Sequence, residues 1–325
     1  MKKNKNSTIS ENDIIYKYLS KLHFNKKESF KFKNDGAILV NKNTHDMVVT
    51  NDTIVESVDF FSNDSPESIA QKIVTYNLSD ISAMGAETYS YTLSLSLPEA
   101  IGQTWIKKFV NRLFFLQKKY NFFLLGGDIS LSKKIHISAN FYGYVKKKLI
   151  LKREQAKIGD NIWVTGNLGD SFIGLSLLKK TIKINKKFNK YFLNKYLYPE
   201  PCLIGSKINK FTNCAIDISD GFLGDLTKLF SKNTGAKIDS SKIPFSNYAL
   251  KLIKLNKISP ITLMNSGDDY ELIFTSSDKF TKKIIEKAIQ NKIKLTKVGR
   301  IADNKGILLD SKKLLNSNNS YQYIF

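Results

Sequence analysis

The fold of this chain is decided by one stretch, Ile216-Asp217-Ile218-Ser219-Asp220-Gly221. An apolar run that starts at Cys214 leads into two aspartates, and apolar residues then recur at helical spacing from Phe222 to Phe230. This pattern predicts a strand, a sharp turn and a helix, with carboxylates at the carboxyl end of the strand. Ligands of open α/β sheets bind at that end, so the stretch also predicts a functional site.

The two aspartates differ in how easily a structural role explains them. Asp220 could simply be the N-cap of the predicted helix, a frequent role of aspartate. That helix is expected to end near Asn233 and Gly235. A structural role explains Asp217 less well, because a carboxylate at the end of an apolar strand needs a partner or a metal ion.

Composition limits the classes of protein to consider. With 325 residues, of which 42% are hydrophobic and 12% aromatic, the chain is globular and long enough for two domains. Its formal charge of +22 suggests a nucleic-acid-binding protein as one interpretation. The lysines are scattered through every segment, however, and Asn, Ile, Phe and Tyr are also abundant. A genome-wide compositional bias produces the same pattern, and we favour that interpretation.

The cysteines and histidines indicate neither a zinc site nor a disulfide framework. Cys202, Cys214 and the three histidines lack metal-ligand spacing, so we interpret both thiols as reduced core residues of a cytoplasmic protein. The basic start of the chain is not followed by the apolar segment of a signal peptide. No apolar run approaches the ~20 residues of a membrane span.

Strands and helices alternate in both halves of the chain, which predicts an α/β or α+β protein with two domains, residues 1–150 and 151–325. The strict alternation over residues 89–97 predicts a strand with one buried face. The apolar run before Gly126-Gly127-Asp128 predicts another strand, followed by a glycine turn and a carboxylate. Further strands are expected over residues 37–40, 47–50, 135–145, 162–165, near 236, 270–275 and 296–301, and helices begin near 10, 66, 104, 170, 187, 202, 247 and 279.

Six aspartates carry the predicted chemistry, and most of them lie beside a glycine or at the edge of an element: Asp35, Asp52, Asp80, Asp128, Asp217 and Asp220. So many like charges can converge only if a counter-ion neutralises them. Oxygen ligands without nearby His or Cys select Mg²⁺ or a similar hard cation. Such a cation usually also holds the phosphates of a nucleotide, which the backbone of a glycine turn can approach closely.

Other nucleotide and catalytic motifs do not occur in the sequence. There is no Walker A motif and no G-x-G-x-x-G pattern, and no Ser/His/Asp or Cys/His arrangement indicates nucleophilic catalysis. Phosphoryl transfer fits what remains, because that reaction needs positioning and charge neutralisation more than a protein nucleophile. We assign no general base.

An ordered set of motifs resembles the thiamine-monophosphate kinase family, which belongs to the aminoimidazole ribonucleotide synthetase-like superfamily. The most specific blocks are N-L-S-D-I-S-A-M-G-A at residues 77–86 and the I-D-I-S-D-G stretch at 216–221. The other blocks are V-T-N-D-T-I-V-E (49–56), L-G-G-D (125–128), T-G-N-L-G-D-S (165–171) and G-D-D-Y-E-L (267–272). The resemblance runs from about residue 10 to the end of the chain.

The resemblance implies a homodimeric, ATP-dependent kinase that converts thiamine phosphate to thiamine diphosphate. It implies dimer contacts in the N-terminal domain, and we expect the strand at 89–97 at or near them. No general base is required, because the acceptor is a phosphate that is already ionised at neutral pH. Carried over by position, the magnesium ligands are Asp35, Thr50, Asn51, Asp52, Asp80, Asp128, Asp217 and Asp220. The implied ATP contacts are Gly127, Asp128, Arg153 and Ser219, and the implied acceptor contacts are Asp59, Asp268 and Tyr321.

The chain departs from the family pattern mostly on the acceptor side. Asp59 replaces a histidine, and Ser266-Gly267-Asp268 replaces Gly-Gly-Glu. Tyr323-Ile324 lies where a histidine is usual. Near the predicted metal site, Lys33-Asn34-Asp35 stands where Gly-Asp-Asp is usual, which removes one carboxylate.

Two alternatives stay open at this point. The first is another enzyme of the superfamily that acts on a different acceptor. A selenophosphate synthetase would need a reactive cysteine near the N-terminus, and no cysteine precedes Cys202. The second is a non-catalytic nucleic-acid-binding protein, although the sequence has no compact basic stripe with interleaved aromatic residues.

Overall fold

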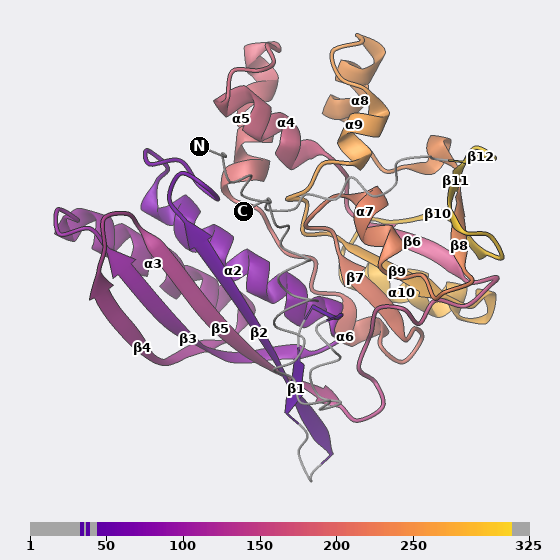
Figure 1. Ribbon diagram of the computed structural model, residues 1–325, viewed down its shortest axis with the longest axis horizontal. Helices are drawn as coiled ribbons and strands as arrows, with labels where there is room; N and C mark the ends of the chain where they lie inside the picture. The colour runs from indigo at the N-terminus through magenta and orange to yellow at the C-terminus, as the bar shows by residue number, and fades with distance from the viewer. Residues whose placement is uncertain (1–32, 36, 40–43, 314–325) are drawn as a thin grey trace, which may run out of the picture.

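A computed structural model of the protein describes residues 33–35, 37–39 and 44–313 (Figure 1). This part of the chain forms two mixed β-sheets with helices packed against them, and the chain leaves the first sheet at Lys146 and enters the second at Asn161. The α/β expectation is therefore confirmed. The domain boundary at residue 150 stays a prediction, and the helix expected to begin near residue 10 lies outside the described residues.

The first sheet has the strand order β1-β2-β5-β3-β4 among the described residues. β3 and β4 run parallel, and the other neighbouring strands run antiparallel. Helices α2 and α3 pack together on one face of this sheet (Figure 1). The elements are β1 (Ala37–Leu39), β2 (His45–Val55), α2 (Pro66–Ala83), β3 (Glu87–Leu97), α3 (Gln103–Tyr120), β4 (Phe123–Leu131) and β5 (His136–Lys146).

The second sheet has the order β12-β11-β8-β10-β6-β9-β7 in the described part of the chain. Its elements are β6 (Asn161–Thr165), α4 (Asp170–Leu178), α5 (Lys186–Leu197), α6 (Gly205–Ile208), β7 (Cys214–Asp217), α7 (Phe222–Thr227), β8 (Gly235–Ile238), α8 (Asn247–Lys254), α9 (Pro260–Met264), β9 (Leu272–Ser276), α10 (Thr281–Gln290), β10 (Leu295–Ala302), β11 (Gly306–Leu309) and β12 (Lys312–Lys313). None of the helices within the described ranges combines the length and the apolar composition that a membrane crossing requires.

Helix α2 is the element that both domains share. Ser65 caps its start by accepting a hydrogen bond from the Ser68 N–H (3.2 Å), and Pro66 occupies the first turn, where an N–H is not needed. The helix ends at Ala83, and Gly85 follows with a φ of 72°, which glycine adopts without strain. Most of its residues are buried, because it packs on the first sheet and also against β7 and α5 of the second domain.

The glycine turn expected at Gly126-Gly127 is wrong. Both glycines lie inside β4, an extended strand that continues through Asp128 to Leu131. A Cβ atom at residue 127 would lie 1.8 Å from the carbonyl oxygen of Leu93 in the neighbouring strand. The glycine is therefore needed for close strand pairing. From the sequence alone, a glycine required for strand pairing cannot be distinguished from a glycine required for a turn.

Other elements differ from expectation in their length. β2 continues to Val55, so Asp52 lies within a strand rather than after one. α7 ends at Thr227, although the apolar pattern continues beyond it. Leu229 lies past the end of α7 and is nevertheless fully buried in the core. The apolar pattern therefore indicated burial correctly at this residue, but not helical structure. Of the helix expected from residue 202, only Gly205–Ile208 is helical.

The seam between the domains combines apolar packing with hydrogen bonds. The Ser82 hydroxyl donates to the Cys202 carbonyl (2.7 Å) and accepts from the Gly205 N–H (3.2 Å). Ala83 packs into an apolar cluster whose other members come from the second domain and the segment before it. A Cβ atom at residue 205 would lie 1.8 Å from the Ser82 carbonyl oxygen, so α2 and α6 approach each other as closely as their backbones allow.

Replacing Gly205 with alanine is expected to destabilise this seam. The added methyl group must displace the backbone of α2 or α6, which lowers the free energy of unfolding by about 1–3 kcal/mol. Denaturant titration of Gly205→Ala and of the parent protein measures the loss. Gly102→Ala is the matched control, because nothing lies within 4 Å of a Cβ atom at that position. Equal effects of the two substitutions would contradict this explanation.

Candidate active site

Three carboxylates from distant parts of the chain meet where the two domains pack together. Asp35 precedes β1, Asp80 lies on α2, and Asp217 is the last residue of β7. One carboxylate oxygen of each residue lies within 4.8 Å of the corresponding oxygens of the other two. Because α2 and β7 belong to different domains, this carboxylate cluster exists only when the domains are packed against each other.

Burial and mutual repulsion raise the pKa values of the cluster. Desolvation raises the pKa of Asp80 and of Asp217 well above the usual range of a carboxyl group, and the charges of neighbouring carboxylates, Asp35 among them, raise it further. Asp217 also accepts a hydrogen bond from the Ser79 hydroxyl (2.9 Å), which favours its charged form. The cluster therefore favours a proton or a cation as its partner.

Asp52 on β2 is a fourth carboxylate next to this cluster. Burial, followed by the charges of Asp35 and Asp59, raises the pKa of Asp52 to about 7. Its Oδ2 atom is buried and has no hydrogen-bond partner among the described residues. A buried carboxylate oxygen without a partner is costly, and a proton or a cation bound at this place would lower that cost.

Arg153 is the counter-charge of Asp35. Its Nε atom donates to Asp35 Oδ2 (3.0 Å), and one of its terminal nitrogens donates to Oδ1. The main-chain N–H of Arg153 donates to the side-chain oxygen of Asn34 (2.7 Å). This fork fixes the orientation of one carboxylate of the cluster. The contact of Arg153 with ATP stays a prediction.

The donor set fits a hard divalent cation such as Mg²⁺. The converging atoms are oxygens of Asp35, Asp80 and Asp217, with the partnerless oxygen of Asp52 beside them. Thr50 lies on the same side of β2, where its hydroxyl donates to the Asn77 side chain (3.0 Å). The excess of negative charge is what a cation at this place would relieve.

Asp220 does not cap helix α7, so the N-cap interpretation is wrong. The N-cap position is Gly221, which makes no side-chain capping bond. Asp225, which is buried, instead accepts the main-chain N–H groups of Asp220 (3.0 Å) and Gly221 (3.2 Å). The Lys228 ammonium donates to the carboxylates of both Asp220 (2.7 Å) and Asp225 (2.8 Å). In this structure a lysine therefore neutralises Asp220.

Two of the three residues predicted to contact the acceptor, Asp59 and Asp268, lie near the cluster. The Asp268 N–H donates to the Ser219 carbonyl (2.9 Å), which joins this loop to the turn after β7. Asp59 approaches from the first domain, and its carboxylate accepts the Val55 N–H (2.7 Å). The charge of Asp59 raises the pKa values of both Asp52 and Asp268, so the acceptor side and the cluster share one electrostatic environment.

Some of the predicted residues are not brought to the cluster within one chain. Asn51 points to the face of the first sheet opposite α2, where it donates to the Asn140 side chain (2.8 Å). Gly127 and Asp128 lie in β4 at the far edge of the sheet. Three strand spacings, about 14 Å, separate Asp128 from β2. Tyr321 lies outside the described residues.

Several residues of the site were missed by sequence reasoning. Ser79, Asp225 and Lys228 all bond to predicted site residues. Asp225 could have been noticed, because it is a third acidic residue within the helical pattern after Asp217, in a chain that is poor in acids. Ser79 and Lys228 give no such signal, since their importance depends on which side of a helix faces the site.

Comparison with known proteins shows the family to which this chain belongs. The family model of the AIR synthase related protein, N-terminal domain, matches residues 33–145, and that of the AIR synthase related protein, C-terminal domain, matches residues 157–310. Thiamine-monophosphate kinase of Buchnera aphidicola subsp. Acyrthosiphon pisum (strain APS) is 39% identical to this chain over 281 residues, which cover 85% of both proteins. The chain belongs to the thiamine-monophosphate kinase family.

Other members of the thiamine-monophosphate kinase family match over nearly the whole chain. The kinase of Buchnera aphidicola subsp. Schizaphis graminum (strain Sg) is 38% identical over 316 residues, covering 94% of this chain and 96% of that protein. A solved structure described as AaThiL complexed with AMPPCP and TMP superposes with a TM-score of 0.82 at 28% identity, covering 94% of this chain and 95% of that chain. The chain thus shares its two-domain fold with this family over almost its whole length.

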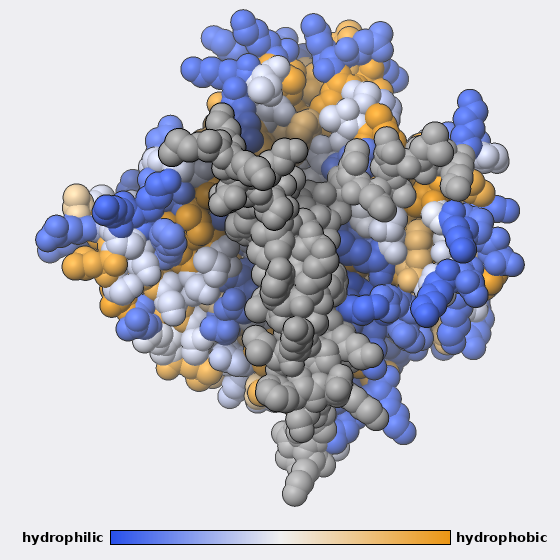
Figure 2. Space-filling model, in the orientation of Figure 1, coloured by the Kyte–Doolittle hydropathy of each residue, from blue (hydrophilic) through white to orange (hydrophobic). Residues whose placement is uncertain are grey.

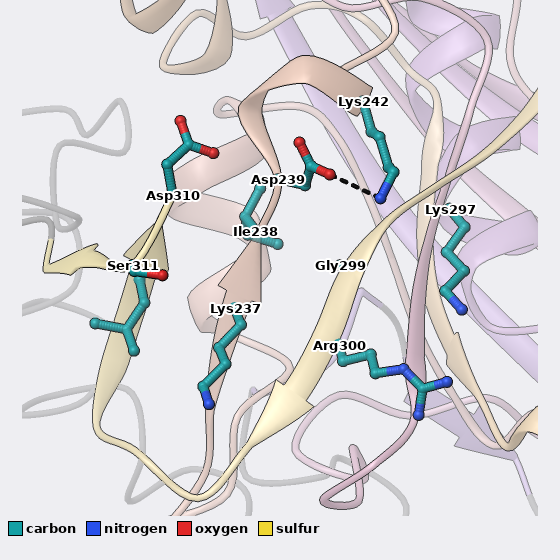
Figure 3. Close-up of a pocket in the computed structure, with 10 residues that line it drawn as sticks. Lys237, Ile238, Asp239, Lys242, Lys297, Gly299, Arg300, Asp310 and Ser311 are labelled. Atoms are coloured by element: carbon teal, nitrogen blue, oxygen red, sulfur yellow. Dashed lines mark ion pairs between the residues drawn. The ribbon is translucent and has the colours of Figure 1, made fainter.

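A basic hollow lies apart from the carboxylate cluster of this family member (Figure 3). It has a volume of about 640 Å³ on the second sheet. Its lining comes from β8, β10, the end of β11 and the turns beside them, and includes Lys237, Asp239, Lys242, Lys297, Arg300 and Asp310. Asp239 and Lys242 form an ion pair there (2.7 Å). Three strands separate β8 from β7, so this hollow takes no part in the arrangement around Asp217.

Magnesium is expected to stabilise the protein more at about pH 8 than at about pH 6. In the folded protein the pKa of Asp52 is about 7, above its ordinary value of 3.8, so folding without a metal favours the protonated form. The metal-free protein therefore loses stability as the pH rises from about 4 to about 7. A bound cation takes the place of the proton, and its effect is largest where the proton is absent. Melting temperatures with and without MgCl₂ at both pH values measure the difference.

Asp52→Asn provides the control for this experiment. An amide carries no charge in this pH range, so the difference between the two magnesium-induced shifts should shrink in the variant. Identical shifts for the parent protein at both pH values would contradict the assignment of a cation site to these carboxylates.

Proposed function

We propose that this chain phosphorylates thiamine monophosphate to thiamine diphosphate with ATP as the phosphoryl donor. The observation that carries the proposal is the carboxylate cluster of Asp35, Asp80 and Asp217, which this chain forms between its two domains. The chain is also a member of the thiamine-monophosphate kinase family. The relative solved with AMPPCP and TMP holds an analogue of ATP. Transfer between two phosphates requires that strong negative charge be neutralised, and the cluster is suited to hold the cations that do this.

The residues of the chain supply orientation. Arg153 fixes Asp35, Ser79 fixes Asp217, and Lys228 fixes Asp220, so the carboxylates are directed before any substrate binds. Mg²⁺ ions, when held by these carboxylates with Asp52 and Asp80, would neutralise the phosphates of donor and acceptor. The acceptor oxygen belongs to an ionised phosphate, so no side chain has to remove a proton from it. Contacts of ATP with Gly127, Arg153 and Ser219 remain part of the proposal.

The main alternative is a different acceptor. Asp59 stands where the family pattern has a histidine, and Asp268 stands where it has a glutamate. Both lie beside the cluster. A basic nucleic-acid-binding protein is less well supported, because hydrophilic residues spread over both domains on the face shown in Figure 2 instead of forming one stripe. The lysines, which are scattered through every segment of the sequence, agree with a compositional bias of the whole chain.

A coupled assay with ATP, Mg²⁺ and thiamine monophosphate, following thiamine diphosphate, tests the proposal. We expect turnover by the parent protein. Asp217→Asn should lower kcat by about 100-fold or more, because the loss of one charge from the cluster weakens charge neutralisation by several kcal/mol. Circular dichroism of both proteins controls for folding. If the parent protein makes no thiamine diphosphate but consumes ATP with another phosphorylated acceptor, the alternative enzyme replaces this proposal.

The location of the protein in the cytoplasm also stays a proposal. Cys202 and Cys214 are free and buried, and burial raises the pKa of both thiols to about 12. At neutral pH both thiols are therefore protonated and unreactive. Free thiols in the core agree with a reducing compartment.

We further propose a homodimer that forms on the first sheet. All nine residues of β4 are exposed, including Ile129 (73%) and Leu131 (77%). An exposed apolar edge strand is a surface that another chain can cover. β3, which was expected at or near the dimer contact, pairs directly with β4. A second copy of the chain on β4 and the adjoining face of the sheet would cover this surface.

A dimer would also explain the distance between Asp128 and the cluster. Asp128 pairs with Ser94, which pairs with Ser138, which pairs with Thr53. Directly opposed residues of a sheet point to the same face, so Asp128 shares the open face with Thr53 and Asn51. We propose that Asp128 of one copy approaches Asn51 of the other copy on this open face, and that the two side chains contribute to the metal and ATP site from the dimer interface.

Two measurements test the dimer and its shared site. Light scattering should give the mass of two 37.0 kDa chains, and Ile129→Lys should give a monomer. Ile289→Lys on α10 is the control, because Ile289 is equally exposed (70%). Asp128→Asn and Asp217→Asn should each be inactive alone, but a refolded equal mixture should regain about a quarter of the parent activity, since half of the dimers carry one intact site. A mixture that stays inactive would place Asp128 outside the partner's site.

A further inference from the structure

Helix α2 carries a lysine in the middle of its buried side. Lys72 is only 1% exposed, although lysine is among the residues that are least often buried. Its ammonium group donates a hydrogen bond to the main-chain oxygen of Asp59 (2.8 Å) and lies 3.7 Å from the centre of the Tyr196 ring. Tyr196 belongs to α5, so Lys72 lies between a turn of the first domain and a helix of the second.

Three carboxylates act on this ammonium group. Burial lowers the pKa of Lys72, and the charges of Asp268, Asp64 and Asp59 oppose that shift. Conversely, burial raises the pKa of Asp268, and the charge of Lys72 is the main factor that lowers it. An apolar side chain of similar length would fill the same space without a desolvation cost. Packing alone therefore does not explain a charged residue at this position.

The loop that carries Asp268 is held in a strained conformation against α2. The Tyr270 hydroxyl donates to Asp268 Oδ1 (2.8 Å), and Asp268 and Tyr270 have φ values of 66° and 51°. Non-glycine residues with positive φ are strained, and such strain concentrates at binding sites. The Tyr270 ring stacks on Tyr76 of α2, with ring centres 4.7 Å apart. The loop is thus clamped to the helix that carries Lys72.

Asp59 approaches Lys72 from the turn after β2. Its carboxylate accepts the Val55 N–H (2.7 Å), and its main-chain oxygen accepts from Lys72. Because the charge of Asp59 also raises the pKa of Asp52, this turn lies beside the carboxylate cluster. A phosphorylated acceptor that reaches the cluster from this side meets the negative charges of Asp59 and Asp268, which repel it.

We infer that Lys72 is a positioning residue for the acceptor: its ammonium group offsets the charges of Asp59 and Asp268, and so allows an anionic acceptor to bind beside them. The inference rests on the proposed function, since it concerns the acceptor of that reaction. Lys72 acts through the two carboxylates and needs no contact with the substrate. Lys72 thus has a role in acceptor binding although it lies outside the carboxylate cluster.

Replacing Lys72 with methionine removes the charge and keeps most of the volume. We expect the KM for thiamine monophosphate to rise about tenfold or more, and the KM for ATP to change by less than about twofold, because only the acceptor side loses its counter-charge. Lys72→Arg, which keeps the charge, should recover most of the loss. Lys207→Met is the matched control, because Lys207 pairs with Glu87 on the surface (2.7 Å), and both KM values should stay unchanged.

The charge compensation is tested separately with Asp59→Asn. This substitution removes a negative charge but keeps an oxygen that can accept the Val55 N–H. Alone, it should lower the KM for thiamine monophosphate by about two- to fivefold, a result that does not depend on how the Lys72 variants fold. Combined with Lys72→Met, it should lower the KM by about tenfold, more than the two- to fivefold that it gives alone, and this non-additivity would show that the two residues are coupled.

The possible outcomes separate the two levels of inference. If Lys72→Met raises both KM values equally, or lowers only the melting temperature, Lys72 is a structural residue and the inference is overturned. A tenfold rise in the acceptor KM of Asp59→Asn, equivalent to about 1.4 kcal/mol, overturns it as well, because the carboxylate itself would then recognise the acceptor. A parent protein that makes no thiamine diphosphate overturns the proposed function, and the inference with it.

Discussion

Mutual repulsion between buried carboxylates is the constraint on which the rest of this structure depends. Asp35, Asp80 and Asp217 are held together by the packing of two domains, although their charges oppose it. The favourable contribution comes from apolar burial along α2 and the seam, where residues such as Ala83 and Ile204 leave water. Folding therefore supplies the free energy that holds the carboxylates together. A bound proton or cation reduces the repulsion between them.

Three basic side chains offset the negative charge of the site. Arg153 binds Asp35, Lys228 binds Asp220 and Asp225, and Lys72 faces Asp59 and Asp268. Arg153 and Lys228 orient their carboxylates through hydrogen bonds, whereas Lys72 acts on its carboxylates through its charge. None of these three basic side chains is freely exposed. The net charge of +22 contributes little to this arrangement, because charges on the surface are screened by water and salt. The electrostatics of the site therefore depends on where these three basic side chains lie, and not on the total number of lysines.

The sequence could be interpreted correctly where the signal was local. Asp217 follows an apolar strand and Asp80 lies in a helix that begins at Ser65-Pro66, so strand, helix and carboxylates were all predictable. The face to which Asn51 points and the place of β4 at the edge of the sheet depend on strand pairing over long distances, and no local pattern reports them. Lys72 did leave a signal, because it lies on α2 between the buried residues Ile69 and Ile73.

The exposed strand β4 has a consequence for a newly made chain. Its nine residues include one charged side chain, Asp128, so the strand offers an open template on which identical strands can pair out of place. Lysines flank it on both sides, at residues 118, 119, 133 and 134, and repulsion between such positive ends opposes this pairing. Salt screens that repulsion. The lysines around β4 thus oppose aggregation of the chain through this strand, and their effect weakens as ionic strength rises.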